Sequence, residues 1–536
     1  MKESITKLFV FKISSIQQRK GLVFSVGIFL FFINYHIAFS QQKTSTYRQD
    51  KKTADKAFDY GDYMNALEIY SKIYNADSTN NEVNYKLGAC YFELKRNRKL
   101  SKKYFDKVVG SDFPEINYYL GRLNHLLGDF DKATYYYLQY KYFGGDNEHS
   151  GKEVDDLIES SRIAPEMISK PDKSVEITNL GNQINTEYPE YVPLIPAEEN
   201  FMFFTSRRKN TIFAKTDPYG NYFEDIYRAE KKDGEWQQPI MLDTIINMPF
   251  HDACTGLSAD GEKLLMYRTS KDLLSGDIYE SFFMDNKWSS PKILCDHINS
   301  TDFVEASACY SPDGEIIFFS SDMPGGFGGK DLYYVKKVPS GSWGKPINLG
   351  PSVNTKYNED APYVNPKGNE LFFSSEGHKN MGGYDVFKSS FDEAYIFGPS
   401  ENMGYPINTV DDDIFFVLNT SGSVGYFSSE RKGGYGSQDI YKVNFLENVK
   451  NLKTCGVNVY DETEELLKQV EINLSEPSSK KLYGTFKSNP NSGKVLIISE
   501  PSKEYEVTIN VDGYEPLVTK SFFKENITSF TLKKAR

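Results

Sequence analysis

The stretch that decides the fold is Ser311-Pro-Asp-Gly-Glu-Ile-Ile-Phe-Phe-Ser-Ser-Asp322, which precedes a glycine loop and then Asp331-Leu-Tyr-Tyr334. The second element, an aspartate followed by an apolar and an aromatic residue, occurs five times. Its copies are 52, 54, 54 and 54 residues apart and begin at Asp225, Asp277, Asp331, Asp385 and Asp439. A period of about 50 residues with several short strands per unit is typical of a β-propeller.

Each copy belongs to a unit with the same order of features. A glycine-containing turn such as Asp313-Gly314 comes first, and an apolar run such as Ile316–Phe319 follows it. Glycine suits such hairpin turns because it adopts positive φ without steric cost. A glycine loop and the Asp-apolar-aromatic strand complete the inner part of the unit. We therefore expect each unit to be one blade.

The ends of the repeat region predict how the ring closes. Residues 177–186 resemble residues 347–355, which form the outer strand of a unit, whereas the fifth unit stops near Phe445 without such a strand. The early segment can supply the missing strand, which would remove the free sheet edges. We predict five blades over residues 174–446.

Composition narrows the class of protein. The chain has 536 residues, 39% hydrophobic and 15% aromatic, with a formal net charge of −12. Its length indicates several domains with large packed cores. We see no basic stripe in the sequence, so nucleic acid is not an expected partner.

Residues 1–40 have the composition of an export signal. A basic leader with Lys12, Arg19 and Lys20 precedes a mostly apolar run over residues 21–39, and Ala38-Phe39-Ser40 offers small residues for cleavage. We expect cleavage after Ser40 and a periplasmic location. The alternative is an uncleaved anchor, because the apolar run is nearly long enough to span a bilayer.

Residues 44–167 are helical in pattern and repetitive. Gly61-Asp-Tyr-Met-Asn-Ala66 recurs as Gly128-Asp-Phe-Asp-Lys-Ala133, and Tyr85-Lys-Leu-Gly88 recurs as Tyr118-Tyr-Leu-Gly121. This pattern resembles the tetratricopeptide repeat, whose helix pairs place small residues where helices cross closely. Such stacks bind partner proteins.

Aromatic residues crowd the end of the third repeat, and they are our candidate partner-binding residues. They are Tyr135, Tyr136, Tyr140 and Tyr142. Aromatic side chains are enriched at protein interfaces as well as in cores. The alternative is that these tyrosines only dock the helical stack onto the propeller.

Residues 453–534 change to short alternating strands. Tyr505-Glu-Val-Thr-Ile-Asn-Val-Asp-Gly-Tyr514 is the clearest, and turns separate the strands every 8–15 residues. This pattern predicts a small β-sandwich. The region resembles the carboxypeptidase regulatory-like (transthyretin-like) domain.

No catalytic motif is visible. The six histidines form no His-Glu-x-x-His motif, and no Gly-x-Ser-x-Gly nucleophile elbow exists. We expect no catalytic residue, no metal and no cofactor. The five repeated aspartates could bind calcium, but one acid per blade is better explained by capping of backbone N–H groups.

One acidic residue precedes the first strand of each unit, which suggests a ring at the channel mouth. These residues are Glu190, Asp252, Glu305, Asp360 and Asp412. Converging like charges would attract a cation or a basic peptide. The alternative, which we favour, is that each acid caps its own strand turn.

The order of helical repeats, propeller and sandwich is similar to that of the PorE-like envelope proteins of Bacteroidota, and the blades look like the WD40-like repeats of TolB. This resemblance implies a scaffold for envelope proteins, linked to type IX secretion or gliding at the outer membrane. Those relatives end in an OmpA-like domain, whereas this sequence ends at Arg536, which puts peptidoglycan binding in doubt. A carbohydrate or small-ligand receptor and an unrecognised enzyme are the alternative functions.

Overall fold

The computed structural model describes residues 46–95, 98–108, 113–143, 151–209, 216–217, 221–271, 273, 275–300, 302–446, 452–524 and 527–535. The predicted export segment 1–40 lies outside these residues. The chain divides into two compact units, Met1–Ile116 and Asn117–Arg536. In the ranges that the structure describes, no helix is both long and apolar enough to cross a membrane.

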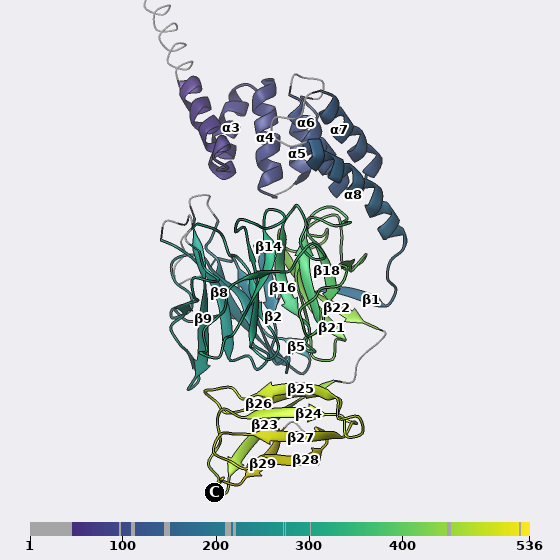
Figure 1. Cartoon of the computed structure of the whole chain (residues 1–536). Helices are drawn as coiled ribbons and strands as arrows, with labels where there is room; N and C mark the ends of the chain where they lie inside the picture. Colours follow the sequence, from purple (N-terminus) through teal and green to yellow (C-terminus); the bar gives the residue numbers. More distant parts are fainter. Residues whose placement is uncertain are drawn as a thin grey trace, which may run out of the picture. The chain divides into compact units, whose positions relative to one another are not determined.

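The N-terminal part is helical, as predicted (Figure 1). A helix covers residues 46–59. The helices that follow are α3 (Tyr63–Ala76), α4 (Asn81–Glu93), α5 (Arg98–Phe105), α6 (Glu115–Leu126), α7 (Phe130–Tyr142) and α8 (Gly151–Ser169).

The repeated Gly-Asp pair joins successive helices. Gly61 and Gly128 both have positive φ, 76° and 78°, which lets the chain turn sharply after a helix. The next residue is then the N-cap: Asp62 accepts a hydrogen bond from Asn65 N, and Asp129 accepts one from Lys132 N. The motif therefore ends one helix and begins the next.

The repeated glycines inside helices allow close packing against an aromatic ring. A Cβ added to Gly88 would lie 2.5 Å from the Phe105 ring, and one added to Gly121 would lie 2.5 Å from the Tyr137 ring. A larger residue would force these helix pairs apart. The close crossings that the sequence predicted are therefore present in both places.

The middle of the chain is a β-propeller-type fold, as predicted. Among the described residues, five antiparallel sheets follow one another along the chain. Within each sheet the main strands lie side by side in their sequence order, except that the fifth sheet also contains β1. Their strands are β2 (Glu190–Leu194), β3 (Phe201–Ser206), β4 (Asp225–Lys232), β5 (Glu235–Trp236) and β6 (Ile240–Met241); β7 (Asp252–Leu257), β8 (Lys263–Thr269), β9 (Gly276–Met284), β10 (Lys287–Trp288) and β11 (Lys292–Ile293); β12 (Ala308–Tyr310), β13 (Ile316–Ser321), β14 (Asp331–Lys336) and β15 (Ile347–Asn348); β16 (Glu359–Val364), β17 (Glu370–Ser375), β18 (Asp385–Ser390) and β19 (Glu401–Asn402); and β20 (Asp413–Leu418), β21 (Val424–Ser429), β22 (Asp439–Phe445) and β1 (Val175–Asn179).

The five sheets follow one another in a closed cycle. The first strands contact one another in cyclic order, β2 with β7, β7 with β12, β12 with β16, β16 with β20 and β20 with β2. Strand β1 pairs with β22, so that Val175 lies opposite Phe445 and Asn179 opposite Tyr441. This is the pairing of an early strand with the last unit that the sequence predicted, and it leaves β22 without a free edge.

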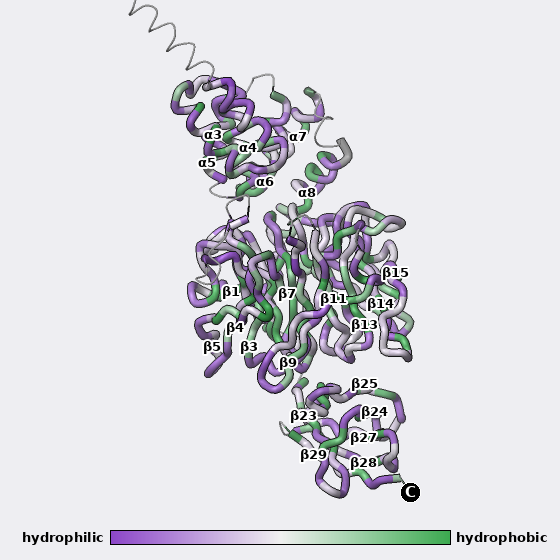
Figure 2. The backbone as a smooth tube through the Cα atoms, turned by 90° about the vertical axis from the view of Figure 1, so that its left-hand side faces the viewer, coloured by the Kyte–Doolittle hydropathy of each residue, from purple (hydrophilic) through white to green (hydrophobic). Residues whose placement is uncertain are grey.

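The second strand of each sheet lies in the core. Phe203, Phe204, Phe318 and Phe319 are fully buried, and β3 and β13 are buried along their whole length. Figure 2 shows such strands as hydrophobic stretches between hydrophilic loops. Strands buried on both faces read as continuous apolar runs, which is why the runs located them in the sequence.

The C-terminal region forms two further sheets around one core. Cys455, Val457, Ile472 and Val507 are buried in a single cluster that both sheets share. One sheet has the order β26-β23-β29 and the other β25-β24-β27-β28. The strands are β23 (Lys453–Asp461), β24 (Glu471–Ser475), β25 (Leu482–Lys487), β26 (Val495–Ser499), β27 (Tyr505–Asn510), β28 (Leu517–Ser521) and β29 (Ile527–Leu532).

A buried asparagine in each connection between propeller sheets bonds the third strand of the sheet that the chain has just left. Asn354 accepts a hydrogen bond from Leu332 N at 2.8 Å and donates one to Leu332 O at 3.0 Å, so its amide bonds both backbone groups of one β14 residue. The same paired bonds recur in all five sheets. The pairs are Asn185 with Ile440, Asn247 with Ile226, Asn299 with Ile278, Asn354 with Leu332, and Asn408 with Val386.

A histidine joins helices α6 and α8 to the fourth sheet. His125 Nε2 lies 2.6 Å from the Met381 carbonyl, and Nδ1 lies 2.9 Å from Ser161 Oγ. Ser160 Oγ donates to Asn380 Oδ1 at 2.6 Å beside it. Because burial disfavours the imidazolium, the pKa of His125 falls to about 4, and the ring is neutral at pH 7.

We predict that Asn354→Ala destabilises the protein by about 3 kcal/mol, because it leaves the buried N–H and C=O of Leu332 unpaired. Urea denaturation at pH 7 measures the change. The control Asn369→Ala removes an exposed asparagine, and we expect it to stay within about 0.5 kcal/mol of the wild type. If both variants changed the free energy of unfolding equally, the hydrogen bonds of Asn354 would contribute no more to stability than an exposed asparagine does.

We also predict that His125 makes the fold sensitive to acid. Its folded-state pKa, about 4, lies below the usual 6.5, so its contribution is present above about pH 6.5 and is lost as pH falls toward 4. The loss relative to His125→Gln should reach about 3 kcal/mol. Denaturation at several pH values measures it, with His297→Gln at an exposed histidine as control. A His125→Gln curve parallel to the wild type would contradict the prediction.

Candidate functional site

The acids at the start of the first strands occupy one equivalent position, and each accepts a backbone hydrogen bond from the turn before it. Thr186 N donates to Glu190 at 2.6 Å, and Thr355 N donates to Glu359 at 2.7 Å. All five acids at this position are fully buried. The donor and acceptor pairs are Thr186 with Glu190, Met248 with Asp252, Ser300 with Glu305, Thr355 with Glu359, and Thr409 with Asp413.

Two of the predicted ring residues are therefore one position out of register. Glu190, Asp252 and Glu305 are at the equivalent position, but in the fourth sheet the residue is Glu359 rather than Asp360. In the fifth sheet it is Asp413 rather than Asp412. Adjacent acids, Glu359-Asp360 and Asp411-Asp412-Asp413, made the register ambiguous in the sequence.

The equivalent acids are also bonded to the second strand of their own sheet. Ser206, Ser321 and Ser375 hydroxyls donate to Glu190, Glu305 and Glu359, each at 2.7 Å. In the second sheet Arg268 takes the place of this serine and lies 2.5 Å from Asp252. These contacts are those of caps within a sheet, which is the alternative that the sequence favoured.

Burial dominates the ionisation of these acids. It raises the pKa of Glu190, Glu305, Glu359 and Asp413 despite their hydrogen bonds, and it raises the pKa of Asp252 to about 6. A carboxylate removed from water is costly unless it is paired. The serine and backbone donors are therefore needed to keep the acids in place.

Asp360 belongs to a separate buried cluster. Its carboxylate lies 3.1 Å from Lys330 Nζ and accepts hydrogen bonds from Ser307 and Ser320 hydroxyls. Burial alone would raise the pKa of Asp360, but Lys330 and Ser307 lower it overall. Asp412 is half-buried and accepts from Tyr384 N at 3.1 Å. Both acids are engaged by the protein itself.

A partly buried ion pair also escaped the sequence analysis. Arg207 lies 2.9 Å from Glu224, and Tyr191 donates to the same carboxylate. Burial alone would raise the pKa of Glu224, but Arg207 and His251 hold it well below its usual range. No periodic signal marks these residues, because the pair exists in the first sheet and not at matching positions in the repeat.

Three of the five repeated aspartates, Asp331, Asp385 and Asp439, cap backbone N–H groups of the loops before them, as predicted. Asp331 accepts from Phe327 N at 2.7 Å and Gly328 N at 3.1 Å, and Asp439 accepts from Tyr435 N at 2.6 Å. A Cβ added to Gly326 would lie 2.5 Å from the Asp331 carboxylate, so the loop needs glycine there. Within the described residues, no group of three or more His, Cys, Asp or Glu side chains could hold a metal ion.

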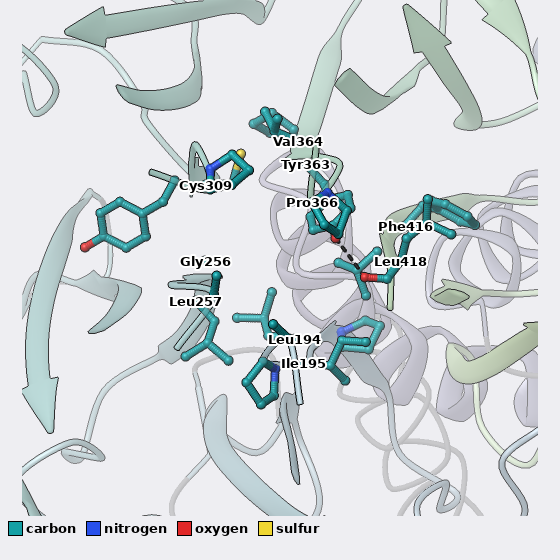
Figure 3. Close-up of a pocket in the computed structure, with 18 of the residues that line it drawn as sticks. Leu194, Ile195, Gly256, Leu257, Cys309, Tyr363, Val364, Pro366, Phe416 and Leu418 are labelled. Carbon is teal, nitrogen blue, oxygen red and sulfur yellow. Dashed lines mark hydrogen bonds between the residues drawn. The ribbon is translucent and has the colours of Figure 1, made fainter. Parts of the chain in front are cut away.

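The first strands of all five sheets line one apolar cavity of about 70 Å³ (Figure 3). Leu194, Leu257, Val364 and Leu418 point toward this space from different strands, and Tyr363 donates a hydrogen bond to the Leu418 carbonyl at 2.8 Å. Cys309 also lines it, and burial raises the pKa of its thiol to about 12. None of the described residues that line the cavity is charged, and its polar side chains include Thr255, Ser311 and Thr420.

Three of these strands bulge at the same position. Val192, Ala361 and Phe415, each two residues after the buried acid, have positive φ of 55°, 53° and 61°. Their strands shift register there. Val192 N donates to Ser428 Oγ and Ala361 N to Ser307 Oγ, both in neighbouring sheets. The bulges thus serve contacts between sheets, which offset the strain of the left-handed backbone.

The four candidate tyrosines separate into exposed and buried positions. Tyr135 and Tyr142 are 56% and 81% exposed, Tyr136 is half-buried, and Tyr140 is fully buried. Tyr140 packs against Tyr118, with ring centroids 5.8 Å apart. One helix therefore carries both core tyrosines and surface tyrosines, so neither sequence interpretation holds for all four.

The chain was compared with known proteins. No protein-family model matches it, and no curated protein matches it. Solved structures that resemble it include an assigned TolB from Agrobacterium tumefaciens, with 16% identity over 51% of this chain and 97% of that chain and a TM-score of 0.28. Others are the β-propeller domain of the trilobed protease from Pyrococcus furiosus, with 10% identity over 62% and 84% and a TM-score of 0.24, and an endo-arabinase from Bacteroides thetaiotaomicron, with 10% identity over 50% and 95% and a TM-score of 0.33. Likenesses this distant say nothing about what this chain binds.

We predict that Glu305→Gln changes the pH dependence of stability. Gln can still accept from Ser321 and Ser300 but cannot ionise. Burial raises the pKa of Glu305, so its contribution is present below the unfolded pKa, about 4.3, and is lost as pH rises through the folded value. The wild type should therefore lose stability relative to Glu305→Gln between mildly acidic and neutral pH, as measured by urea denaturation.

The matched control is Glu393→Gln, which removes an exposed carboxylate. The free energy of unfolding of this variant should change with pH in the same way as that of the wild type. A Glu305→Gln curve that is also parallel would mean that Glu305 ionises as an exposed acid, and the cap assignment would fail.

Proposed function

We propose that the chain is a non-catalytic, periplasmic scaffold of the cell envelope that binds a partner protein through its helical repeats. In this proposal the five sheets are the blades of a WD40-like propeller, residues 44–167 are tetratricopeptide-type repeats, and residues 453–534 are a carboxypeptidase regulatory-like sandwich. The resemblance to PorE-like proteins supports a place beside type IX secretion or gliding components.

The observation that carries the proposal is an exposed stripe on α7. Tyr135, Leu138 and Tyr142 are 56%, 51% and 81% exposed, and Phe143 is 62% exposed. The spacing of three and four residues places the first three on one side of the helix. Tyr142 and Phe143 contact edge to face at 5.1 Å. We call these four residues the α7 stripe.

The surroundings of the α7 stripe fit a protein partner. Lys132 is paired with Asp129, and Lys141 lies 2.5 Å from Asp155, so the nearby charges are already neutralised. An aromatic centre with few free charges is the composition of interface hot spots. The i, i+3, i+7 spacing suits an amphipathic helix of the partner, which packs its own apolar ridge along such a row.

The propeller supports a framework role in this proposal. Its conspicuous carboxylates are bonded to serines, backbone N–H groups or basic side chains of the same protein. A general acid or base must instead be available to a substrate. The propeller is therefore assigned the role of a rigid framework.

The test is a crosslinked pull-down from the native envelope, read by mass spectrometry, with the wild type and with Tyr135→Ser, Leu138→Ser and Tyr142→Ser combined. We expect the triple variant to lose its main protein partner at least tenfold, because hot-spot residues contribute about 2 kcal/mol each. Its thermal unfolding should match the wild type, since all three side chains are exposed.

The control combines Tyr60→Ser, Phe327→Ser and Tyr435→Ser, which are exposed aromatics outside the α7 stripe. It should retain the partner. If the stripe variant captures the same proteins as the wild type, the proposed binding site is wrong; if both triple variants lose them equally, binding depends on general surface hydrophobicity instead.

A further inference from the structure

Basic residues are concentrated in one short stretch of a chain whose net charge is −12. Residues 95–107 contain seven basic side chains and one acidic side chain. The expectation that the chain carries no basic stripe is therefore wrong for α5 and its flanks. The stretch is short and lies inside one helical repeat, which is why the overall composition hides it.

The charge is divided between the two units of the chain. Residues 46–116 carry 13 basic and 11 acidic side chains, whereas residues 117–536 carry 43 basic and 62 acidic ones. The unit that contains α5 thus has the opposite net charge to the rest of the described chain. Such asymmetry indicates a partner for the first unit that is itself anionic.

The lysines of this stretch lie on the solvent side. Lys102, Lys103 and Lys107 are exposed, while Tyr104 and Phe105 beside them are buried. Asp106 lies 2.6 Å from Lys102 and offsets part of its charge, whereas Lys107 Nζ donates to the Tyr74 hydroxyl at 2.6 Å. We call the three lysines the α5 basic face.

Two lysines of the α5 basic face, Lys103 and Lys107, both act on the hydroxyl of Tyr74. The hydrogen bond from Lys107 lowers the pKa of the Tyr74 hydroxyl, and Lys103 adds to this effect. Because two lysines act on one phenol, their positive potentials overlap above α5. Overlapping potentials attract an extended anionic surface more strongly than scattered lysines do.

We propose that the α5 basic face binds the surface of an anionic lipid bilayer. Lysine is a point charge on a flexible stem, which suits phosphate headgroups that move laterally, whereas a fixed carboxylate or phosphate in a protein is usually met by the arginine fork. Arg98 of the same helix is half-buried, whereas Lys102, Lys103 and Lys107 are exposed, so the exposed basic side chains that the structure describes here are lysines.

Two observations favour a bilayer over a protein or a nucleic acid. Among the described residues of 46–116, the large hydrophobic side chain that is exposed is Tyr60, so the face lacks the apolar centre of a protein interface. The nearby rings are already packed on one another: Tyr104 lies 5.4 Å from Tyr74 and 5.6 Å from Tyr91. None of these three rings is therefore presented for stacking on a base.

The place of the first unit in the sequence agrees with this assignment. The apolar run over residues 21–39 ends seven residues before the helix at residue 46 begins. If the run stays in the bilayer, the tether raises the effective concentration of headgroups near α5, so a weak electrostatic contact suffices. Each lysine near an anionic surface contributes about 1 kcal/mol. The inference does not depend on the proposed partner of the α7 stripe.

The test is co-sedimentation of residues 41–536, which contain every described element, with vesicles of phosphatidylcholine alone or mixed with phosphatidylglycerol. We expect binding to the mixed vesicles, loss of binding at high salt, and a loss of roughly a hundredfold in Lys102→Glu, Lys103→Glu and Lys107→Glu combined. The control combines Lys520→Glu, Lys524→Glu and Lys533→Glu, which makes the same charge change at exposed lysines elsewhere.

Each outcome decides the proposal. Retained binding in the control together with loss in the α5 variant supports it. Equal sedimentation with both kinds of vesicle, or equal loss in both variants, overturns it. So does tighter binding to a polyglutamate peptide or an oligonucleotide than to the mixed vesicles at equal anionic charge, because the partner would then be an acidic protein or a nucleic acid.

Discussion

The propeller depends on buried amides that bond both backbone groups of one strand residue from the connection between two sheets. Asn185, Asn247, Asn299, Asn354 and Asn408 lie in these connections, and each bonds the third strand of the sheet that the chain has just left. Asn185 does so across 255 positions of the chain, because its sheet is completed by β22. A carboxamide is neutral and carries both a donor and an acceptor, so it satisfies a buried peptide unit without adding charge. Sheets fixed in this way can keep the buried acids and the left-handed bulges in place.

The buried acids of the propeller are likewise hydrogen-bonded within the protein. Acid, serine and backbone N–H recur together, as in Glu359, Ser375 and Thr355. Each group completes the hydrogen bonding of another, so that burial is tolerated. The exposed aromatic side chains and lysines described above lie on the helices instead. They form the α7 stripe and the α5 basic face. In the proposed function, binding belongs to the helical region and rigidity to the sheets.

The sequence revealed those features that depend on repetition. The Asp-apolar-aromatic strands, their glycine loops and the pairing of β1 with β22 were all visible, because each recurs with a fixed period or completes a unit that lacks one strand. The sequence did not reveal which acid of the fourth and fifth sheets is at the equivalent position. Asp360 and Asp412 each have an acidic neighbour, and the repeat period does not distinguish adjacent acids. The asparagine contacts had a signal, the recurring apolar-Asn pair in Ile184-Asn185 and Val353-Asn354, but only the fold shows that the amide bonds a strand peptide of the sheet before it. The tyrosines of α7 occupy several sides of one helix, so the sequence could not separate exposed Tyr142 from buried Tyr140.

The pairing of β1 with β22 also determines how the molecule responds to mechanical load. The chain enters the propeller at Val175 and leaves it at Phe445, and these two residues face each other in the ladder. A pull between the helical region and the C-terminal region therefore acts on a single residue pair at one end of two antiparallel strands. Such a load opens backbone hydrogen bonds one after another, from Val175–Phe445 toward Asn179–Tyr441. The other four sheets carry none of this tension, and they would keep their shape while the fifth sheet yields.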